Sequence, residues 1–401
     1  MNFFRSVSLA ASDPILGLNE RFIADRNPLK VNLGMGVYVD DSGKLPLMRA
    51  VASAEASLAS RQRTRSYLPI DGIAAFARAA KSFAFGSALN DSNEPRIATV
   101  QCLGGTGGLR VAADFLRQFH GDASVLISSP TWDNHRGIFN RAGFEVDTYP
   151  YYDSKTRALD HDGLCEKLRS ARAGTIVVLH ACCHNPTGVD LSASQWDEVV
   201  SIMTARQLLP VLDMAYQGFG EGVVQDSLAA RKLLEAGGDF LVATSFSKSF
   251  SLYGERIGSL SAATQSEDDA ARVLSQLKTA IRTNYSSPPT HGAALVTEVL
   301  GDASLRTLWM EELAEMRSRI HTMRLALREQ LKSQRTGHDY AFVTRQIGMF
   351  TYSGLTAQQM RRLREEFSVY GVDNGRICVA GLNESNVSYV AEAIKAVEIL
   401  S

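Results

Sequence analysis

The stretch Thr244-Ser-Phe-Ser-Lys-Ser-Phe-Ser-Leu-Tyr-Gly-Glu-Arg256 says most about the fold and chemistry of this chain. The apolar run Phe240-Leu-Val-Ala before it is typical of a buried strand, so Lys248 is expected just beyond a strand end. A lysine amine there can condense with an aldehyde to form a Schiff base. Serine hydroxyls and Arg256 suit a phosphate group. Pyridoxal 5′-phosphate combines both groups, although the stretch alone equally fits a polar loop with a solvated lysine.

Around this stretch, short apolar runs alternate with longer amphipathic segments. Such alternation predicts an α/β fold, in which helices cover both faces of a mostly parallel sheet. The expected strands are residues 124–128, 175–180, 208–213, 240–243 and 257–262, and the expected helices are residues 109–119, 194–206 and 227–236.

The last third of the chain has a different pattern. Residues 303–332 form one long amphipathic segment, which we expect to bridge into a second unit. Strands are expected at 350–353 and 376–380, around a helix at 357–366. This part is therefore predicted to be a smaller α+β unit.

The composition is that of an ordinary globular protein. The 401 residues are 45% hydrophobic and 21% charged, and 42 basic against 43 acidic residues give a formal net charge of −1. Neither nucleic acid nor an anionic membrane is indicated as a partner, and no apolar run is long enough to cross a bilayer. With no signal-peptide pattern, we expect reduced thiols in the cytoplasm for the five cysteines. They are Cys102, Cys165, Cys182, Cys183 and Cys378.

The polar residues that follow the expected strands point to a common site. Ligands of open parallel sheets bind beyond the carboxyl ends of the strands, where residues 180–188, 213–216 and 245–248 fall. Asp213 ends an apolar run and needs a cationic partner, such as a protonated pyridine nitrogen, unless it caps a helix. Tyr216 can direct its hydroxyl to the same ligand or pack in the core.

The glycine cluster Gly104-Gly-Thr-Gly-Gly precedes a helical pattern and suits a phosphate, because backbone amides and a helix N-terminus favour an anion. By itself the cluster also fits a simple turn. It lacks the Gly-Lys-Ser/Thr ending of a nucleotide P-loop, and Gly34-Met-Gly36 lacks the third glycine of a dinucleotide site.

The segment His180-Ala-Cys-Cys-His184 has the residue types of a metal site, but Asn185-Pro-Thr-Gly follows at once as a turn and no second ligand cluster appears. We therefore predict that this segment binds no metal. His180 is expected to pack in the core or to support the site from behind, and Asn185 is expected to contact a ligand.

Trp132 can stack on an aromatic cofactor or pack in the core. Arg282 and Arg376 can each form a bidentate hydrogen bond with a carboxylate or a surface ion pair.

Taken together, these segments resemble the class I aminotransferases of the aspartate and aromatic amino acid group, over nearly the whole chain. The motifs that carry the resemblance are His184-Asn-Pro-Thr-Gly188, Asp213-Met-Ala-Tyr-Gln-Gly-Phe, Ser245-Phe-Ser-Lys-Ser-Phe and Asn284-Tyr-Ser-Ser-Pro-Pro. The resemblance implies the type I fold of pyridoxal-phosphate-dependent transferases and a homodimer with shared active sites. It also implies an N-terminal arm and part of a small domain in residues 1–46, a large cofactor domain in 47–315, and the rest of the small domain in 316–401.

The resemblance further implies a role for each site residue. Lys248 is expected to carry the Schiff base, with Asp213 on the pyridine nitrogen, Tyr216 and Asn185 on the ring hydroxyl oxygen, and Trp132 against the ring. The residues expected to hold the phosphate are Gly105, Thr106, Ser245, Ser247, Arg256 and, from the neighbouring subunit, Tyr67. Those expected to bind substrate are Arg376, Asn185, Trp132 and the backbone near Gly36, with Arg282 reaching across the dimer to a side-chain carboxylate. His135 and His180 are expected to support these groups from behind.

The expected activity is ping-pong amino-group transfer from aspartate and aromatic amino acids (tyrosine, phenylalanine) to 2-oxoglutarate. Arg282 favours acidic substrates, since a buried guanidinium without an anion is costly. Val39 and Leu45 are expected to put apolar groups near the entrance, and Ser287 follows the aromatic-type Tyr-Ser-Ser-Pro-Pro pattern. The alternatives are a strict aspartate aminotransferase and, with less support, a lyase or decarboxylase of the same fold.

Overall fold

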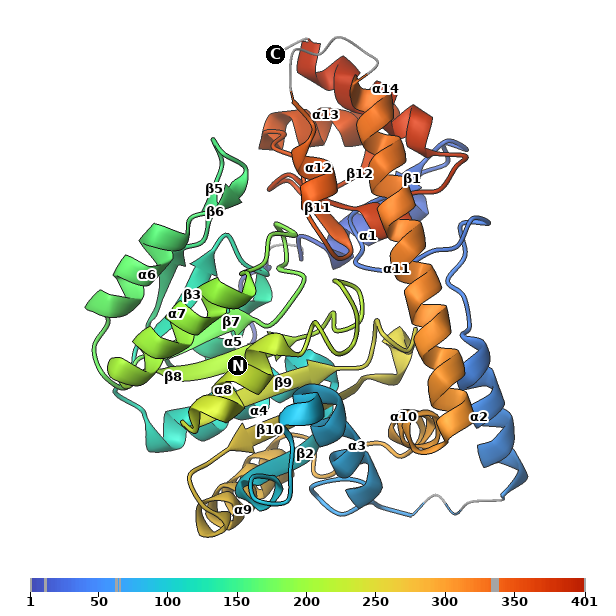
Figure 1. Cartoon of the computed structure of the whole chain (residues 1–401). Coiled ribbons are helices and arrows are strands. Elements are labelled where there is room, and N and C mark those ends of the chain that lie inside the picture. Colours follow the sequence, from blue (N-terminus) through green and yellow to red (C-terminus); the bar gives the residue numbers. More distant parts are fainter. Residues whose placement is uncertain (1, 11–12, 62–63, 65, 333–338, 400–401) are drawn as a thin grey trace.

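The computed structural model describes the chain except residues 1, 11–12, 62–63, 65, 333–338 and 400–401. Its described residues form a central seven-stranded sheet in the order β2-β10-β9-β8-β7-β3-β4 (Figure 1). The strands are β2 (Ile97–Leu103), β3 (Val125–Ser129), β4 (Val146–Pro150), β7 (Ile176–His180), β8 (Leu209–Met214), β9 (Phe240–Ser245) and β10 (Ile257–Ala263). All run in one direction except β10, which pairs antiparallel with both neighbours.

The predicted α/β class with a mostly parallel sheet is confirmed, and each expected strand is present within two residues of its predicted bounds. The expected helices are α4 (Gly104–Phe119), α7 (Ala193–Ala205) and α8 (Leu228–Ala236). A capping box fixes the start of helix α7, because Gln195 N donates to Ser192 Oγ (3.3 Å) and Ser192 N donates to Gln195 Oε1 (2.9 Å). Strands β2 and β4 were not predicted.

Both faces of the sheet are covered, as a parallel sheet requires. In β7, Val177 and Leu179 point into one hydrophobic cluster, while Ile176 and Val178 point into another. Helices α6 (His161–Ser170), α7 and α8 cover the first face, and α4, α5 (Asn134–Arg141) and α9 (Glu267–Asn284) cover the second.

A second unit joins both ends of the chain. Strand β1 (Val31–Asn32) pairs parallel with β12 (Val369–Tyr370), and β11 (Phe350–Tyr352) pairs antiparallel with β13 (Arg376–Cys378). The long helix α11 (Ala303–Lys332) has the predicted bounds and runs from the base of the molecule to this unit (Figure 1). The remaining elements are α1 (Leu16–Ala24), α2 (Arg49–Ser60), α3 (Ala74–Phe85), α10 (His291–Gly301), α12 (Phe342–Arg345), α13 (Ala357–Phe367), α14 (Val387–Ile399) and the short hairpin of β5 (Tyr152–Asp153) and β6 (Ala158–Leu159). The division at residues 46 and 315 stays a prediction.

Helix α11 carries a charged side chain inside the protein. Arg324 is 2% exposed, and its guanidinium donates to acceptors in α12, in β11 and in the loop between them. Its acceptors are Val343 O (2.9 Å), Thr351 Oγ1 (2.6 Å), Ile347 O (3.2 Å), Gly348 O (2.9 Å) and Phe350 O (2.5 Å). Arg324 therefore ties the long helix to the strand that bears Phe350.

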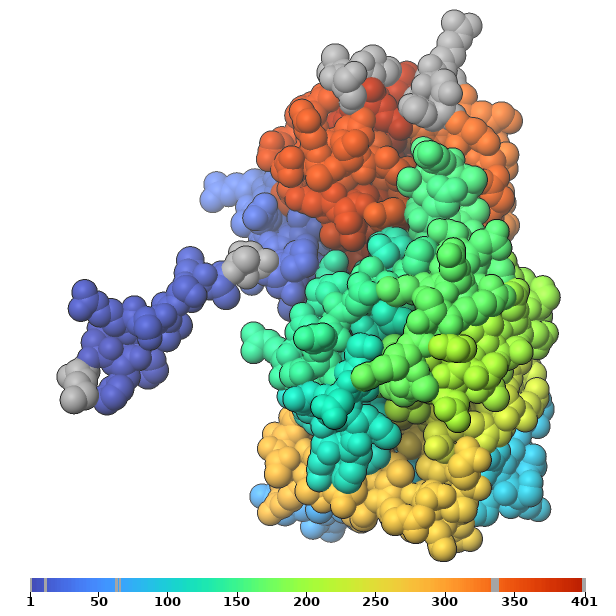
Figure 2. Space-filling view, turned by 90° about the vertical axis from the view of Figure 1, so that its left-hand side faces the viewer, coloured from blue at the N-terminus to red at the C-terminus, as the bar shows by residue number. Residues whose placement is uncertain are grey.

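The N-terminal residues 2–10 are exposed and project from the body of the molecule (Figure 2). Their apolar side chains Phe3, Phe4, Val7 and Leu9 are exposed. Among the helices of the described residues, none combines the length and apolar character needed to cross a membrane.

Candidate active site

A cavity of about 450 Å³ lies at the carboxyl ends of the parallel strands. The segments after β2, β3, β7, β8 and β9 all contribute to it, as expected for an open parallel sheet. Most of the predicted site residues line this cavity, namely Gly36, Gly105, Thr106, Trp132, Asn185, Asp213, Tyr216, Ser245, Ser247, Lys248, Arg256 and Arg376.

Lys248 follows β9 and projects into this cavity, with Nζ 4.9 Å from the centroid of the Tyr216 ring. Burial lowers the pKa of Lys248 to about 8, and the positive charges of Arg256 and Arg376 act in the same direction. The Asp213 carboxylate opposes this shift. The amine is thus partly neutral near physiological pH, which a nucleophile or proton acceptor requires.

Asp213 lies near the end of β8, and its buried carboxylate is held by a histidine behind it. His135 Nε2 lies 3.0 Å from Asp213 Oδ2, and Thr131 Oγ1 lies 2.8 Å from His135 Nδ1. Burial alone would raise the pKa of Asp213, but the His135 hydrogen bond and nearby cationic groups outweigh it and lower the pKa. The carboxylate therefore stays ionised and available to a cationic ligand.

The histidines behind the cavity have different surroundings. The His180 ring centroid lies 4.9 Å from that of His135, and its Nε2 has no hydrogen-bond partner among the described residues. Burial lowers the pKa of His180 well below its usual value, so its ring is neutral. Both nitrogens of His184 face hydroxyls, Ser128 Oγ at 2.9 Å and Thr187 Oγ1 at 2.8 Å. Because both of its ring nitrogens have hydroxyl partners, His184 stabilises the turn before Asn185.

One end of the cavity has the character of an anion site. Helix α4 begins there with Gly104, and Arg256 Nη1 donates to Ser247 Oγ (3.3 Å) and to Tyr253 O (3.0 Å). Gly104 has a φ of +70°, and a Cβ on it would lie 2.7 Å from Arg256 Nη2. Glycine is thus required for the helix N-terminus and the guanidinium to approach each other so closely.

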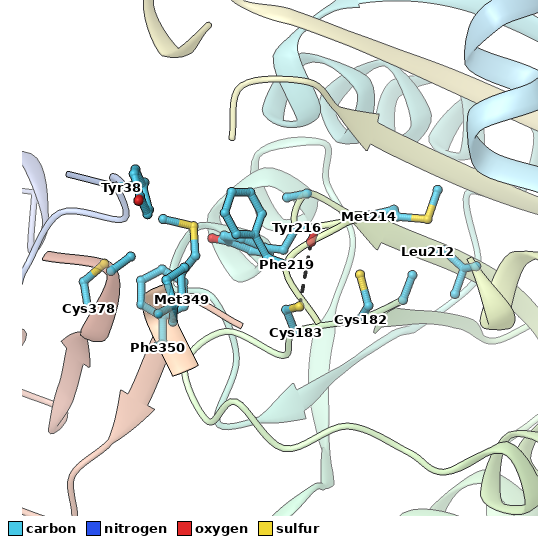
Figure 3. Packing of buried hydrophobic residues seen from close by; sticks show 14 of the residues in the cluster. Tyr38, Cys182, Cys183, Leu212, Met214, Tyr216, Phe219, Met349, Phe350 and Cys378 are labelled. Carbon is cyan, nitrogen blue, oxygen red and sulfur yellow. Dashed lines mark hydrogen bonds between the residues drawn. The ribbon is translucent and has the colours of Figure 1, made fainter. Parts of the chain in front are cut away.

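The other end contains a second guanidinium. Arg376 Nη1 donates to Asn185 Oδ1 (3.0 Å) and Nη2 donates to Gly34 O (2.6 Å), while its buried Nε has no partner among the described residues. Arg376 also lies 4.5 Å from the centroid of the Phe350 ring. Phe350 in turn packs edge-on against Tyr216 at 5.5 Å, inside the apolar cluster of Figure 3. The orphaned Nε–H is a donor suited to an oxygen of a carboxylate.

Two predicted site residues lie elsewhere in this single chain. Tyr67 is 95% exposed, and Arg282 is exposed, with its guanidinium hydrogen-bonded to the Ser286 hydroxyl. Neither lines the cavity, and their predicted roles across a dimer stay predictions. Val39 lines a neighbouring cavity beside Asn383 and Leu45 is exposed, so their expected place near the entrance stays a prediction.

Sequence reasoning missed several residues that line the cavity, among them Ile15, Met35, Tyr253 and Phe350. Tyr253 lies within the stretch that decides the fold, and its hydroxyl accepts a hydrogen bond from Tyr38 N (3.1 Å). Its position between Lys248 and Arg256 in the chain was a usable signal. Ile15 and Met35 come from the N-terminal segment, and no local pattern places them at a strand end.

The donor set fits pyridoxal 5′-phosphate. An anion end, an amine of lowered pKa and an ionised carboxylate surround one cavity, matching in kind a phosphate, an aldehyde and a protonated ring nitrogen. An α/β sheet with these groups at its strand ends is the arrangement of a pyridoxal-phosphate-dependent enzyme. Consistently, the sequence profile of "Aminotransferase class I and II" matches residues 28–394, and the chain belongs to this family.

Individual relatives resemble the chain over almost its full length. It is 52% identical to an aspartate aminotransferase of Pseudomonas aeruginosa, over 98% of this chain and 99% of the relative. It is 48% identical to an aromatic-amino-acid aminotransferase of Escherichia coli, over 98% of this chain and all of the relative. The crystal structure of an aromatic-amino-acid aminotransferase from Burkholderia pseudomallei, covalently bound to pyridoxal phosphate, superposes with a TM-score of 0.95 at 54% identity, over 99% of this chain and all of that one.

Proposed function

We propose that this protein transfers the amino group of aspartate and of aromatic amino acids to 2-oxoglutarate, in a ping-pong reaction that uses pyridoxal 5′-phosphate. The observation that carries the proposal is the buried Lys248 amine, whose pKa is lowered to about 8 in a cavity with an anion end and an ionised carboxylate. Relatives named for aspartate and for aromatic substrates are about equally similar to the chain, which supports both substrate classes.

Each part of the cofactor has a matching group in the cavity. Lys248 would bind the aldehyde covalently, and Asp213 would accept a hydrogen bond from the ring nitrogen. Tyr216 and Asn185, whose side chains lie 3.2 Å apart, would hold the ring hydroxyl oxygen, and Trp132 would lie against the ring. The groups that would bind the phosphate are Gly105, Thr106, Ser245, Ser247 and Arg256.

The cofactor, when bound, supplies an electrophilic carbon for the substrate amine and an aromatic ring that withdraws electrons from the substrate Cα. The residues of the chain then bind, orient and move protons. Arg376 binds the α-carboxylate through its guanidinium, held in place by Asn185 and the Gly34 carbonyl. Lys248 Nζ accepts the Cα proton as a neutral amine and returns a proton as an ammonium. His135 keeps Asp213 oriented and ionised throughout.

We further propose that the working form is a homodimer with shared sites. Arg282 and Tyr67 are exposed and lie outside the cavity, and residues 2–10 expose apolar side chains that a second copy would cover (Figure 2). In this arrangement Arg282 of the second copy binds the side-chain carboxylate of aspartate or 2-oxoglutarate.

The cytoplasm is the proposed location, because all five cysteines are free thiols in this structure.

Steady-state kinetics test the substrate proposal. We expect turnover of aspartate, tyrosine and phenylalanine with 2-oxoglutarate, and parallel lines in double-reciprocal plots. Undetectable turnover of both aromatic substrates would leave a strict aspartate aminotransferase. Product formation without any 2-oxo acid acceptor would instead indicate a lyase or decarboxylase. Reduction with borohydride followed by peptide mass spectrometry is expected to place the cofactor on Lys248, and a different residue would refute the site.

Mixed dimers test the shared site. Lys248→Ala and Arg282→Ala homodimers should both turn over aspartate poorly. When the two chains are mixed in one dimer, one site regains Lys248 from one chain and Arg282 from the other. We expect aspartate turnover to reappear in the hybrid, whereas no recovery would show that Arg282 acts on its own chain or not at all.

A further inference from the structure

A cluster of three metal-type donors lies on the sheet-covering helices, away from the cavity. His161 and Cys165 are one turn apart on α6, and Glu198 is on the neighbouring helix α7. One donor atom from each lies within 4.8 Å of the others. None of the three lines the candidate active site. The proposed transaminase reaction therefore makes no use of them.

We propose that His161, Cys165 and Glu198 form a binding site for a borderline divalent cation such as Zn²⁺, which bridges α6 and α7. Imidazole nitrogen, thiolate and carboxylate are the ligand types that Zn²⁺ takes. Two ligands at positions i and i+4 share one face of a helix, which is the spacing used by helical zinc motifs.

The distances agree with this assignment. Tetrahedral Zn²⁺, with Zn–N of about 2.0–2.1 Å and Zn–S of about 2.3 Å, places nitrogen and sulfur roughly 3.6 Å apart. His161 Nε2 and Cys165 Sγ are 3.6 Å apart. Glu198 Oε2 lies 2.9 Å from the same nitrogen, so the carboxylate must move outward by a few tenths of an ångström. Its side chain is 44% exposed and has room to move.

The surroundings also suit a bound cation. Arg169 pairs with the other carboxylate oxygen, Glu198 Oε1, at 2.5 Å and can orient Glu198 in the way that outer partners orient metal ligands. Cys165 is 1% exposed but His161 is 18% exposed, so a metal enters from the side of His161 and leaves a fourth position for water.

Two other donor clusters are less available. His135, His180 and Asp213 belong to the candidate active site. Cys182 and Cys183 lie near Asp226, but the Asp226 carboxylate already accepts hydrogen bonds from four backbone amides, those of Gly218, Gly220, Glu221 and Gly222. Among the described residues, the cluster at His161 lies outside the candidate active site, and its carboxylate is held by side chains (His161 and Arg169) and not by backbone amides.

Cobalt titration of the holoenzyme tests the site, because Co²⁺ adopts the same geometry and a thiolate ligand gives it a charge-transfer absorption. We expect one Co²⁺ per chain, displaced by Zn²⁺, with release of the Cys165 proton. Cys165→Ser should abolish the band, and His161→Ala should weaken binding by at least the roughly 10- to 100-fold that loss of an outer partner costs. Glu166→Gln, an exposed carboxylate on the same helix, is the matched control and should bind as the native chain does.

Two outcomes would overturn the assignment. The native chain could show no thiolate band at saturating Co²⁺, or the band could persist in Cys165→Ser, which would place the metal at another of the free cysteines. Transamination by each variant verifies its folding, because the cluster contacts no group of the active site. If Cys165→Ser fails to fold, loss of cobalt affinity in His161→Ala decides the question, since His161 is partly exposed.

Discussion

Replacing Arg324 by methionine tests the energetic role of the buried guanidinium on α11. Methionine replaces the aliphatic part of the side chain but leaves four carbonyls and the Thr351 hydroxyl without this donor. At about 1 kcal/mol for each acceptor, the low end of the cost of leaving one unpaired in the interior, the loss is about 5 kcal/mol. Removing a buried cation returns about 2 kcal/mol of desolvation. The expected net destabilisation is therefore about 3 kcal/mol.

Urea unfolding of the holoenzyme, followed by circular dichroism, measures this difference. Arg328→Met is the matched control, because Arg328 lies one turn further along α11, is only partly buried, and has a 3.4 Å hydrogen bond to Thr344 Oγ1. Its substitution should cost about 1 kcal/mol or less. Equal stability of the two variants, or an Arg324→Met variant as stable as the native chain, would refute the reasoning. Arg324 holds the Phe350 carbonyl, and the Phe350 ring packs against Arg376, the proposed ligand of the substrate α-carboxylate. We therefore also expect a raised KM in Arg324→Met.

Three further results are expected. Arg376→Lys should lower kcat/KM by roughly 10- to 100-fold for aspartate and tyrosine alike, because a forked, charge-assisted contact to the shared α-carboxylate is lost; a loss confined to one substrate would contradict this role. In cofactor-free protein, the free energy of unfolding should rise between about pH 8 and the ordinary lysine range, because folded Lys248 has released a proton that the unfolded chain still binds. Urea midpoints of Lys248→Met should lack that rise. Gly258→Ala would place a Cβ 2.4 Å from the Gly104 carbonyl carbon, and should cost about 1–3 kcal/mol and weaken cofactor binding. Gly254→Ala, with open space around its Cβ, is the control in a thermal melt and should be unaffected.

The sheet was predictable where its strands are uniformly apolar. Strands β7, β8 and β9 are buried on both faces, so their runs stand out from the sequence. Strand β2 escaped notice because Thr99 and Gln101 interrupt it. Inside the protein both are satisfied, since Thr99 Oγ1 lies 2.9 Å from Ser261 Oγ and Gln101 Nε2 donates to Pro289 O at 2.7 Å. Such partners are distant in the sequence and cannot be inferred from local pattern.

The site was predictable to the extent that its residues follow strand ends. Lys248, Asp213 and Asn185 do so, and the structure places all three on one cavity. Arg324 does not, because a charged residue on an amphipathic helix normally faces solvent, and only tertiary contacts reveal the carbonyls around it. Tyr67 and Arg282 are different again, since their predicted partners belong to a second copy of the chain.

The reversed direction of β10 has a consequence for how the chain can vary in length. Because β10 starts at the edge where β9 ends, one tight return carries the chain from Lys248 to Arg256 without crossing the molecule. Residues 249–255 thus act as a spacer of set length between Lys248, the proposed covalent anchor, and Arg256, the proposed phosphate ligand. Extra residues there would pull Lys248 and Arg256 apart. The turn at 264–266 lies at the opposite end of β10, so a change in its length would leave the spacing of these two side chains unaltered.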